Sequence, residues 1–597
     1  MALASGETVL LGRVDLAEMR RHVEFLCGFD KTSGTEGEAR AASYIAETLE
    51  SYGVTTHTYT FGAYLSYPKS AGLEIEGLGA IRAKTRAFSE STPAGGVTGE
   101  VCYVPGAVDM FTDTETVERI KALDLSGKIV LSEGGGRQNM LVARQKGAIG
   151  YIHMWPSDED VIHEGIVTPI WGTPTPGTID TLPHIPVISI TKGDALKTKA
   201  LLGERKVTAH INTVVETGWQ KVTLTEAEIP GKSAEYVLIG GHLDSWHIGA
   251  TDNVTGNVTC LELARVLNLH KDELVRGVKI AWWPGHSTGR YAGSTWYCDR
   301  FWQDLRDNCV TYINIDSPGV LGAYDYSAVT AVAENEQFAA DIVTEITGQT
   351  PEDERPSRAG DQSFWGPGIS SLFMLLSNRP PGQRAQVGGS GMGWWWHTEQ
   401  DTLDKVEMPV LEKDWKVYAL ATYRLCTCEV LPLKVSGQAR EIKMALESMC
   451  QGTPSFDMAP ALAEAKSLLD VAVRFEAALD KLVAAGEAIA GPALAKAKSA
   501  ANQTVLRAVK TLTPVLYSPV DRFDQGPATP IKPIPALVPA ASLEKMDPSS
   551  DEYRFLVTSL TRKRNSVVWA LAEARRALQE SIVMSVDEVL RVGSRRK

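Results

Sequence analysis

The sequence has no long apolar run, no surplus of positive charge and few cysteines. No stretch of its 597 residues is long and apolar enough to span a bilayer. The net charge of −13 argues against nucleic acids and anionic membranes as partners, because both favour basic patches. The opening "MALASGETVLLGRVDLAEMRRHVEF" lacks a charged segment followed by an apolar one, so we expect no secretory signal.

The eight cysteines are scattered and too sparse for a disulfide scaffold. Cys426 and Cys428 are separated by one residue, which is not the spacing of zinc ligands. We therefore expect reduced thiols and a cytoplasmic location.

The remaining composition is that of an ordinary globular protein, 44% hydrophobic and 22% charged. A chain of 597 residues is too long for one core. Changes in sequence texture predict an α/β domain whose two parts are residues 1–64 and 221–432. Short β-branched runs rich in Gly and Pro predict a β-rich insertion over 65–220, and apolar residues at three- and four-residue spacing predict a helical region over 433–597.

Polar side chains follow four predicted strands of the α/β domain. These side chains are His242 with Asp244 and Asp252 in "GHLDSWHIGATDN", His286 after "VKIAWW", Asp316 after "VTYINI", and His397, which follows "ISSLFMLL" after the segment "SNRPPGQRAQVGGSGMGWWW". In an open α/β sheet, ligands bind beyond the carboxyl ends of the strands, so one crevice can gather all of these residues. Imidazole and carboxylate ligands together suit Zn²⁺ or a similar divalent ion.

Each residue also has a structural explanation. Asp252 precedes a helical pattern and can serve as an N-cap, and Asp316 before "SPG" can stabilise a turn. A single histidine after a strand is often only a packed, hydrogen-bonded group. The joint pattern nevertheless favours a metal site.

The segment "VLIGGHLDSWHIGATDNVTGNVTCLELARVL" strongly resembles the metal-binding segment of the zinc-dependent aminopeptidase and glutamate carboxypeptidase family. "YINIDSPG" and "WHTEQDTLDKV" resemble its next aspartate and last histidine motifs, and "GDQSFWGPGISSLFML" resembles the segment between them. "DLSGKIVLSEGG", "ARQKGAIGYIHMW" and "IPVISI" resemble the protease-associated domain that many members carry. The C-terminal region resembles the dimerisation domain of the branch that includes the transferrin receptor.

The resemblance implies a mixed α/β metallopeptidase sheet, a homodimer and a two-metal centre. By this resemblance, His242 and Asp316 would hold one ion and His397 the other, with Asp252 bridging. Asp244 would be the carboxylate that orients His242.

One segment departs from the family pattern. Active members carry two glutamates after the third strand, the first a general base and the second a metal ligand, followed by Gly-Ser. Here the run is "GHSTGRYAGS", which puts His286 and Ser287 at the place of the two glutamates if Gly293-Ser294 is the family's Gly-Ser.

Three interpretations of this replacement stay open. His286 can be a metal ligand together with Asp252 and His397. It can instead be the general base, since neutral imidazole accepts a proton near pH 7, with one ion in the centre. In the third interpretation the protein only binds. The four remaining ligands argue against that, and His247 and Glu399 are further proton acceptors nearby in the sequence.

The sequence therefore predicts a metallohydrolase that acts on an amide or peptide bond of a small molecule or peptide, with one or two ions of zinc or another divalent metal. A metalloenzyme that cleaves a non-peptide C–N bond by hydrolysis or elimination is the alternative among enzymes, and a catalytically silent receptor-like protein is the alternative outside them. Four residues near the expected crevice are candidate substrate contacts: Arg290, Tyr291, Arg358 and Trp396.

Overall fold

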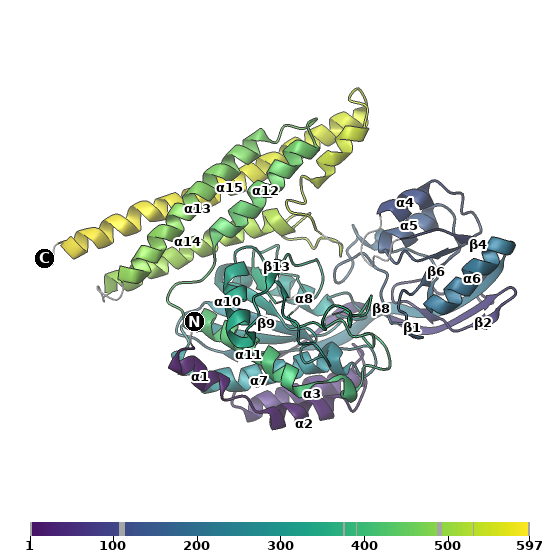
Figure 1. Ribbon diagram of the computed structural model, residues 1–597, viewed down its shortest axis with the longest axis horizontal. Coiled ribbons are helices and arrows are strands. Elements are labelled where there is room, and N and C mark those ends of the chain that lie inside the picture. The colour runs from purple at the N-terminus through teal and green to yellow at the C-terminus, as the bar shows by residue number, and fades with distance from the viewer. Residues whose placement is uncertain are drawn as a thin grey trace.

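The computed structural model describes residues 3–106, 114–373, 376–389, 391–485, 492–528 and 531–594. Figure 1 shows a central α/β body, a smaller α/β body beside it and a layer of long helices across one side. Within the described part of the chain, no helix combines the length and apolar character needed to cross a membrane.

The sheet of the central body has four parallel strands at one end of its strand order. In spatial order these are β14 (Ser370–Leu372), β11 (Cys309–Asn314), β9 (Tyr236–His242) and β10 (Gly277–Trp283). Strand β9, "YVLIGGH", is buried at every position because helices cover both faces of the sheet. The carboxyl ends of β9, β10 and β11 therefore meet at one edge, where their following loops lie side by side.

Helices cover the sheet on two sides. On one face lie α1 (Ser5–Leu11), α2 (Leu16–Leu26), α3 (Glu36–Ser51), α7 (Thr255–Leu269), α10 (Glu336–Thr347) and α11 (Met408–Thr427). On the other face lie α8 (Ala292–Arg300) and α9 (Trp302–Asn308), packed on Trp283 and Tyr312 of the sheet. A separate parallel pair is formed by β12 (Ala328–Thr330) and β13 (Glu352–Glu354). This mixed α/β sheet with flanking helices is the fold class that the sequence predicted.

Two long antiparallel strands, β1 (Thr55–Ile75) and β8 (Thr208–Ile229), run from the central body into the smaller one (Figure 1). The end of β8 pairs with β10, and its beginning pairs with β4 (Val97–Tyr103). The predicted limits of the insertion, at residues 65 and 220, thus each fall inside a strand. Those domain limits stay predictions, but the two bodies share one hydrogen-bonded sheet.

The smaller body has its own strands, helices and core. Its further strands are β2 (Gly79–Ile81), β3 (Lys84–Thr85), β5 (Ile129–Ser132), β6 (Gly150–Met154) and β7 (Val187–Ile190). Its helices are α4 (Thr114–Lys121), α5 (Arg137–Gln145) and α6 (Lys192–Glu204). Strands β5, β6 and β7 are fully buried, consistent with the β-branched runs noted in the sequence.

The C-terminal helices are α12 (Val435–Gly452), α13 (Ala459–Ala485), α14 (Pro492–Tyr517) and α15 (Asp551–Ser594). They pack on one another around a core separate from that of the sheet, as the helical spacing predicted. The proline-rich segment between α14 and α15 contributes only a short helix, η5 (Val538–Lys545). Part of that segment, residues 525–528, returns to contact both other bodies.

Candidate active site

Two histidines and one carboxylate form the centre of the site at the sheet edge. His242 is the last residue of β9, and Asp252 lies in the short irregular helical turn η2 (Ala250–Val254) that precedes α7. Asp252 Oδ1 lies 2.9 Å from His242 Nε2, and its Oδ2 lies 3.1 Å from His397 Nε2. One carboxylate thus spans the two imidazoles. The side chain of Asp252 is therefore used in the site and not as a helix N-cap.

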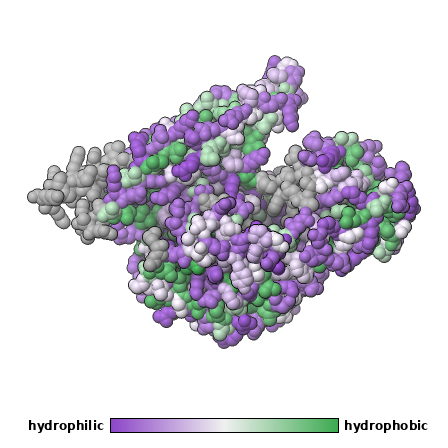
Figure 2. Space-filling model, in the orientation of Figure 1, coloured by the Kyte–Doolittle hydropathy of each residue, from purple (hydrophilic) through white to green (hydrophobic). Residues whose placement is uncertain are grey.

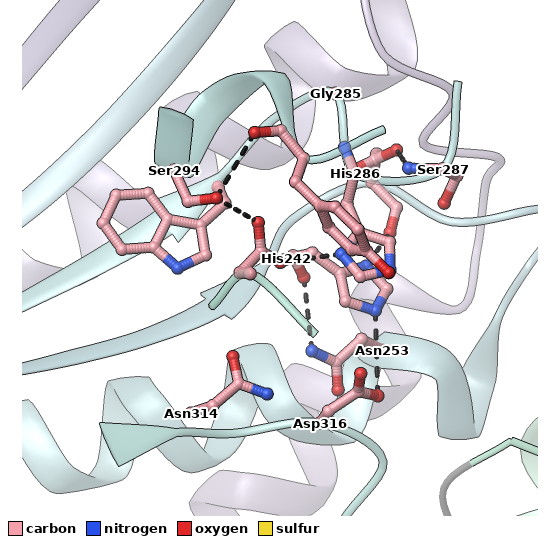
Figure 3. A network of polar contacts seen from close by, with 12 residues as sticks. His242, Asn253, Gly285, His286, Ser287, Ser294, Asn314 and Asp316 are labelled. Carbon is pink, nitrogen blue, oxygen red and sulfur yellow. Dashed lines mark hydrogen bonds and ion pairs between the residues drawn. The ribbon is translucent and has the colours of Figure 1, made fainter. Parts of the chain in front are cut away.

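Asp316, just beyond β11, completes this group. Its Oδ1 is 3.8 Å from His242 Nε2 and accepts a hydrogen bond of 2.9 Å from Ser317 Oγ. Figure 3 shows Asp316 beneath the two stacked rings of His242 and His286. One potential ligand atom from each of His242, His286 and Asp316 lies within 4.8 Å of the others. Sequence-distant residues from three strand ends therefore converge on one point.

Buried carboxylates give this centre a strong preference for positive charge. Burial alone would lower the pKa of His242, but contacts with Asp252 and Asp316 hold it well above its usual range. Burial alone would raise the pKa of Asp252, but His242 and His397 hold it well below its usual range. A divalent cation meets the same electrostatic demand. Together with the imidazole and carboxylate donors, this fits zinc or a similar ion.

The loop after β10 brings His286 onto His242. The two rings stack with centroids 3.8 Å apart and planes 16° apart. His286 Nδ1 donates a 2.7 Å hydrogen bond to Asp361 Oδ2, and Ser294 Oγ donates a 2.6 Å bond to the other oxygen of Asp361. Because Nδ1 is engaged, Nε2 is the nitrogen of His286 left for a metal ion or a proton. Asp361 was not predicted as a site residue.

Asp244 has a different role from the one that the family resemblance implied. The acceptor for His242 Nδ1 is the backbone oxygen of Asp244, at 2.7 Å, and not its carboxylate. The carboxylate instead accepts the backbone N–H groups of His286 and Ser287 at 3.0 and 2.9 Å. Asp244 is fully buried, so both contacts are shielded from water. One residue therefore orients the first histidine and fixes the loop that carries the second.

A second aspartate missed by the sequence reasoning holds the loop of Asp252. Asp401 accepts the backbone N–H of Thr251 at 2.9 Å and that of Asp252 at 3.0 Å. Burial raises the pKa of Asp401 to about 7. Asp401 lies four residues after His397 in the chain. It therefore connects the loop that carries His397 to the loop that carries Asp252.

The site opens into a cavity of about 280 Å³. Its floor holds Asp252, His286, Asp316 and His397. Its opposite wall comes from the smaller body, through residues that the sequence analysis did not assign: Arg86, Gly135, Arg137, Trp155, Glu164, Gly165 and Ile166. The volume is at the small end of the range for small-molecule sites.

The smaller body also contacts the floor directly. Glu164 N–H donates to the backbone oxygen of His397 at 2.8 Å, and His397 Nδ1 donates to the backbone oxygen of Glu164 at 3.2 Å. The latter bond directs His397 Nε2 toward Asp252. Trp396 stacks on the other side of the His397 ring, with centroids 3.6 Å apart. The orientation of His397 thus depends on both bodies.

Three of the four predicted substrate contacts line this cavity: Arg290, Tyr291 and Trp396. Arg358 does not line it. Its guanidinium donates to the backbone oxygen of Gln362 at 2.7 Å and to Gln525 Oε1 at 2.8 Å, and lies 4.0 Å from the Trp171 ring centroid. Arg358 joins the segments behind the cavity wall, so the interpretation of it as a substrate contact is corrected.

The other two acceptors noted in the sequence, His247 and Glu399, form a separate group with Glu164. Lys84 lies within it, with its Nζ 2.8 Å from Glu164 Oε1 and 2.6 Å from Glu399 Oε1. His247 Nε2 is 3.2 Å from the same oxygen of Glu164. The lysine already supplies the cation here, so the group is an ion-pair network between the two bodies.

Comparison with known proteins adds to this geometry. Residues 225–421 match peptidase family M28. The resemblance to zinc-dependent aminopeptidases and glutamate carboxypeptidases is therefore confirmed. The chain is 24% identical over 345 residues to a probable glutamate carboxypeptidase, VP8, of Zea mays, covering 48% of each. The chain thus spans about half the length of this curated relative.

Solved aminopeptidases share the fold. An aminopeptidase from Aneurinibacillus sp. strain AM-1 aligns with a TM-score of 0.55 and 21% identity, covering 70% of this chain and 96% of that one. A zinc aminopeptidase from Bacillus subtilis aligns with a TM-score of 0.53 and 18% identity, covering 70% and 96%. At these identities the likeness establishes the M28-type fold, and the chemistry has to be argued from this chain's own residues.

Proposed function

We propose that the protein is a metal-dependent hydrolase that cleaves an amide or peptide bond of a small substrate. The observation that supports this best is the single carboxylate of Asp252 between His242 and His397, with Asp316 and His286 beside it. These five residues supply imidazole and carboxylate donors at a buried point facing the cavity. The zinc named for the Bacillus subtilis aminopeptidase supports zinc or another divalent ion here.

In this proposal His242, Asp316 and His286 would hold one ion, and Asp252 and His397 would contribute ligands to a second. A divalent ion bound there would act as a Lewis acid on the substrate carbonyl and acidify a water molecule. The protein's part is to orient the ligands: the Asp244 backbone oxygen fixes the ring of His242, and Asp361 fixes that of His286. Trp396 and residues of the smaller body line the cavity beside these ligands.

The role of His286 as a ligand competes with a role as general base. Both need the Nδ1–Asp361 hydrogen bond, since it selects the tautomer with a free Nε2. The grouping of His286 with His242 and Asp316 within 4.8 Å favours the ligand role. This grouping of His286 with His242 and Asp316 differs from the one expected from the sequence, in which His286 shares an ion with Asp252 and His397.

Metal content per chain tests the proposal and separates these roles. We expect the purified protein to bind a divalent ion, His286→Ala to lose at least one equivalent, and Ser287→Ala, in the same loop, to keep the parental content. Equal metal content in the parent and His286→Ala, with activity lost only in the latter, would make His286 the base. If no variant takes up metal on titration, the hydrolase proposal fails and a silent binding protein replaces it.

The nature of the substrate bond is tested separately. Dipeptides and N-acylated amines carrying the same acyl group are compared for release of free amine by the metal-loaded protein. Turnover of the dipeptide supports a peptidase. Turnover of the N-acylated amine alone supports the non-peptide C–N alternative, since the replaced glutamate pair then serves different bond chemistry.

We also propose that the helical region joins two copies of the chain and that the smaller body is a protease-associated domain. Large apolar side chains lie on the outer surface of α15, where Phe555 is 71% and Trp569 is 55% exposed. Figure 2 shows hydrophobic residues among hydrophilic ones on the helical layer. Sedimentation of the protein and of Trp569→Lys tests the dimer. A cytoplasmic location stays part of this proposal; the eight cysteines are free thiols.

A further inference from the structure

A buried arginine in the cavity wall has no carboxylate partner among the described residues. Arg290 lines the cavity and is only 7% exposed. Among the described residues, no group forms a hydrogen bond with its Nε or Nη2. An unpaired guanidinium away from water is costly, so such groups in native proteins are normally paired with an anion.

The backbone holds Arg290 in this position at a conformational cost. Arg290 and Tyr291 have φ angles of 50° and 70°, in the left-handed region that ordinary side chains avoid. The backbone oxygen of Arg290 accepts a 2.6 Å hydrogen bond from Gly172 N–H, and the Tyr291 ring packs on Trp171 at 4.1 Å. Strained residues held by their surroundings in this way cluster at binding sites.

The acidic residues of the cavity are all engaged elsewhere. Asp252 and Asp316 contact His242, and Glu164 contacts Lys84 and His247. Burial lowers the pKa of Arg290, which is the effect expected of a cation without a nearby carboxylate.

The rest of the cavity is suited to a small ligand with an apolar part. Trp155, Trp246, Tyr291 and Trp396 provide aromatic surface. Arg86 adds a second positive charge, although its Nε already donates to Ser189 Oγ at 2.7 Å. The floor offers the candidate metal ligands, and the wall offers one guanidinium that lies over the Tyr291 ring at 5.1 Å and has no carboxylate partner among the described residues.

We propose that Arg290 binds a carboxylate of the substrate, so that the substrate is a small amide that carries a free carboxylate near the scissile bond. The planar guanidinium matches a carboxylate through two parallel hydrogen bonds, which a neutral amide cannot reproduce. This inference rests on the proposed amide hydrolysis for the identity of the ligand. The binding of the carboxylate can nevertheless be measured without turnover.

The test compares binding of matched carboxylate and carboxamide ligands by isothermal titration calorimetry. N-acetyl-L-leucine is compared with N-acetyl-L-leucinamide for a terminal carboxylate, and N-acetyl-L-glutamic acid 1-amide with N-acetyl-L-glutaminamide for a side-chain carboxylate. In at least one pair we expect the carboxylate to bind about tenfold more tightly or better, about 1.4 kcal/mol. Arg290→Gln should bring that ratio near one, and Arg300→Gln, an exposed charge outside the cavity, should leave it unchanged.

The titrations are made on the metal-loaded protein and after chelation, because a carboxylate also binds metal directly. A preference that survives chelation and disappears in Arg290→Gln supports the proposal even if no amide is hydrolysed. Thermal unfolding of Arg290→Gln should show no loss of stability, since the substitution removes an unpaired buried charge. Equal affinities within both pairs, or a preference unchanged in Arg290→Gln, would overturn the carboxylate site while leaving hydrolysis intact.

Discussion

The loops after β9 and β10 differ in their relation to the family pattern but not in how firmly they are held. The β9 end carries His242 in a motif that matches the aminopeptidase and carboxypeptidase resemblance, and the β10 end leads to His286, where the sequence resemblance predicted a departure from the family's glutamate pair. Both rings are fixed through Nδ1, the first by the Asp244 backbone oxygen and the second by the Asp361 carboxylate. A buried carboxylate thus holds the ring of His286 as a metal ligand or general base would require, which supports the proposed role of His286 in the site.

Asp252→Asn should have the largest effect, because it removes the charge that both ends of the site share. We expect loss of bound metal and a fall in the rate of amide hydrolysis on the order of a thousandfold. Metal analysis and steady-state kinetics measure it. Asp404→Asn, an exposed carboxylate in the neighbouring loop, is the control and should change neither. Full activity in Asp252→Asn would contradict the assignment of the bridge.

Asp361→Asn tests whether the β10 end is as important as the β9 end. We expect metal affinity or activity to fall by about ten- to a hundredfold, since the amide no longer stabilises the orientation of His286 as a carboxylate does. The double variant with His286→Ala should be little worse than His286→Ala alone, because the two residues act as one unit. Additive losses would show that Asp361 acts independently of the ring.

The pH dependence of stability tests the buried carboxyl group of Glu38 on α3, which lies near Asp244. Burial raises the pKa of Glu38 from 4.5 to about 8, with the charge of Asp244 adding to the shift. The folded protein then binds a proton that the unfolded chain has lost, so stability should fall as pH rises from about 4.5 to about 8 and level off above it. The contribution is about 1.4 kcal/mol per pH unit.

Denaturant unfolding at several pH values measures this effect. Glu38→Gln should remove that component of the fall, whereas Glu36→Gln, exposed on the same helix, should retain it. Identical pH profiles for the parent and Glu38→Gln would show that Glu38 titrates normally.

Glu399→Gln should have the smallest effect. It removes one ion pair of Lys84 between the two bodies, but Glu399 is 56% exposed and Lys84 keeps its contact with Glu164. The expected change in unfolding free energy is about 0.5 kcal/mol or less. Thermal unfolding measures it, and a drop of several degrees would mean that this pair matters for holding the cavity wall.

The sequence predicted the site residues that lie in one loop or that follow a predicted strand. The His-x-Asp motif and Asp252 share one loop, and the distant His286 and Asp316 could be added because the carboxyl ends of neighbouring strands meet at one sheet edge. Strand alternation likewise indicated the sheet, since buried parallel strands need continuous apolar runs.

The unpredicted parts depend on contacts that only folding creates. Asp361 follows His286 by 75 residues, and nothing in its surrounding sequence indicates that contact. The carboxylate and the backbone oxygen of Asp244 belong to one residue, so the sequence could not tell which of them orients His242. Arg358 was close to the site along the chain, but its side chain turns behind the wall.

The continuity of β1 and β8 limits how the cavity can change shape. Rotating the smaller body away from the floor would bend two paired strands and break their ladder of hydrogen bonds, in addition to the Glu164–His397 bonds. A wide clamshell opening is therefore unfavourable, and the mouth of the cavity keeps a nearly constant width. In the proposed hydrolase, this fixed frame would select substrates by size without a moving lid.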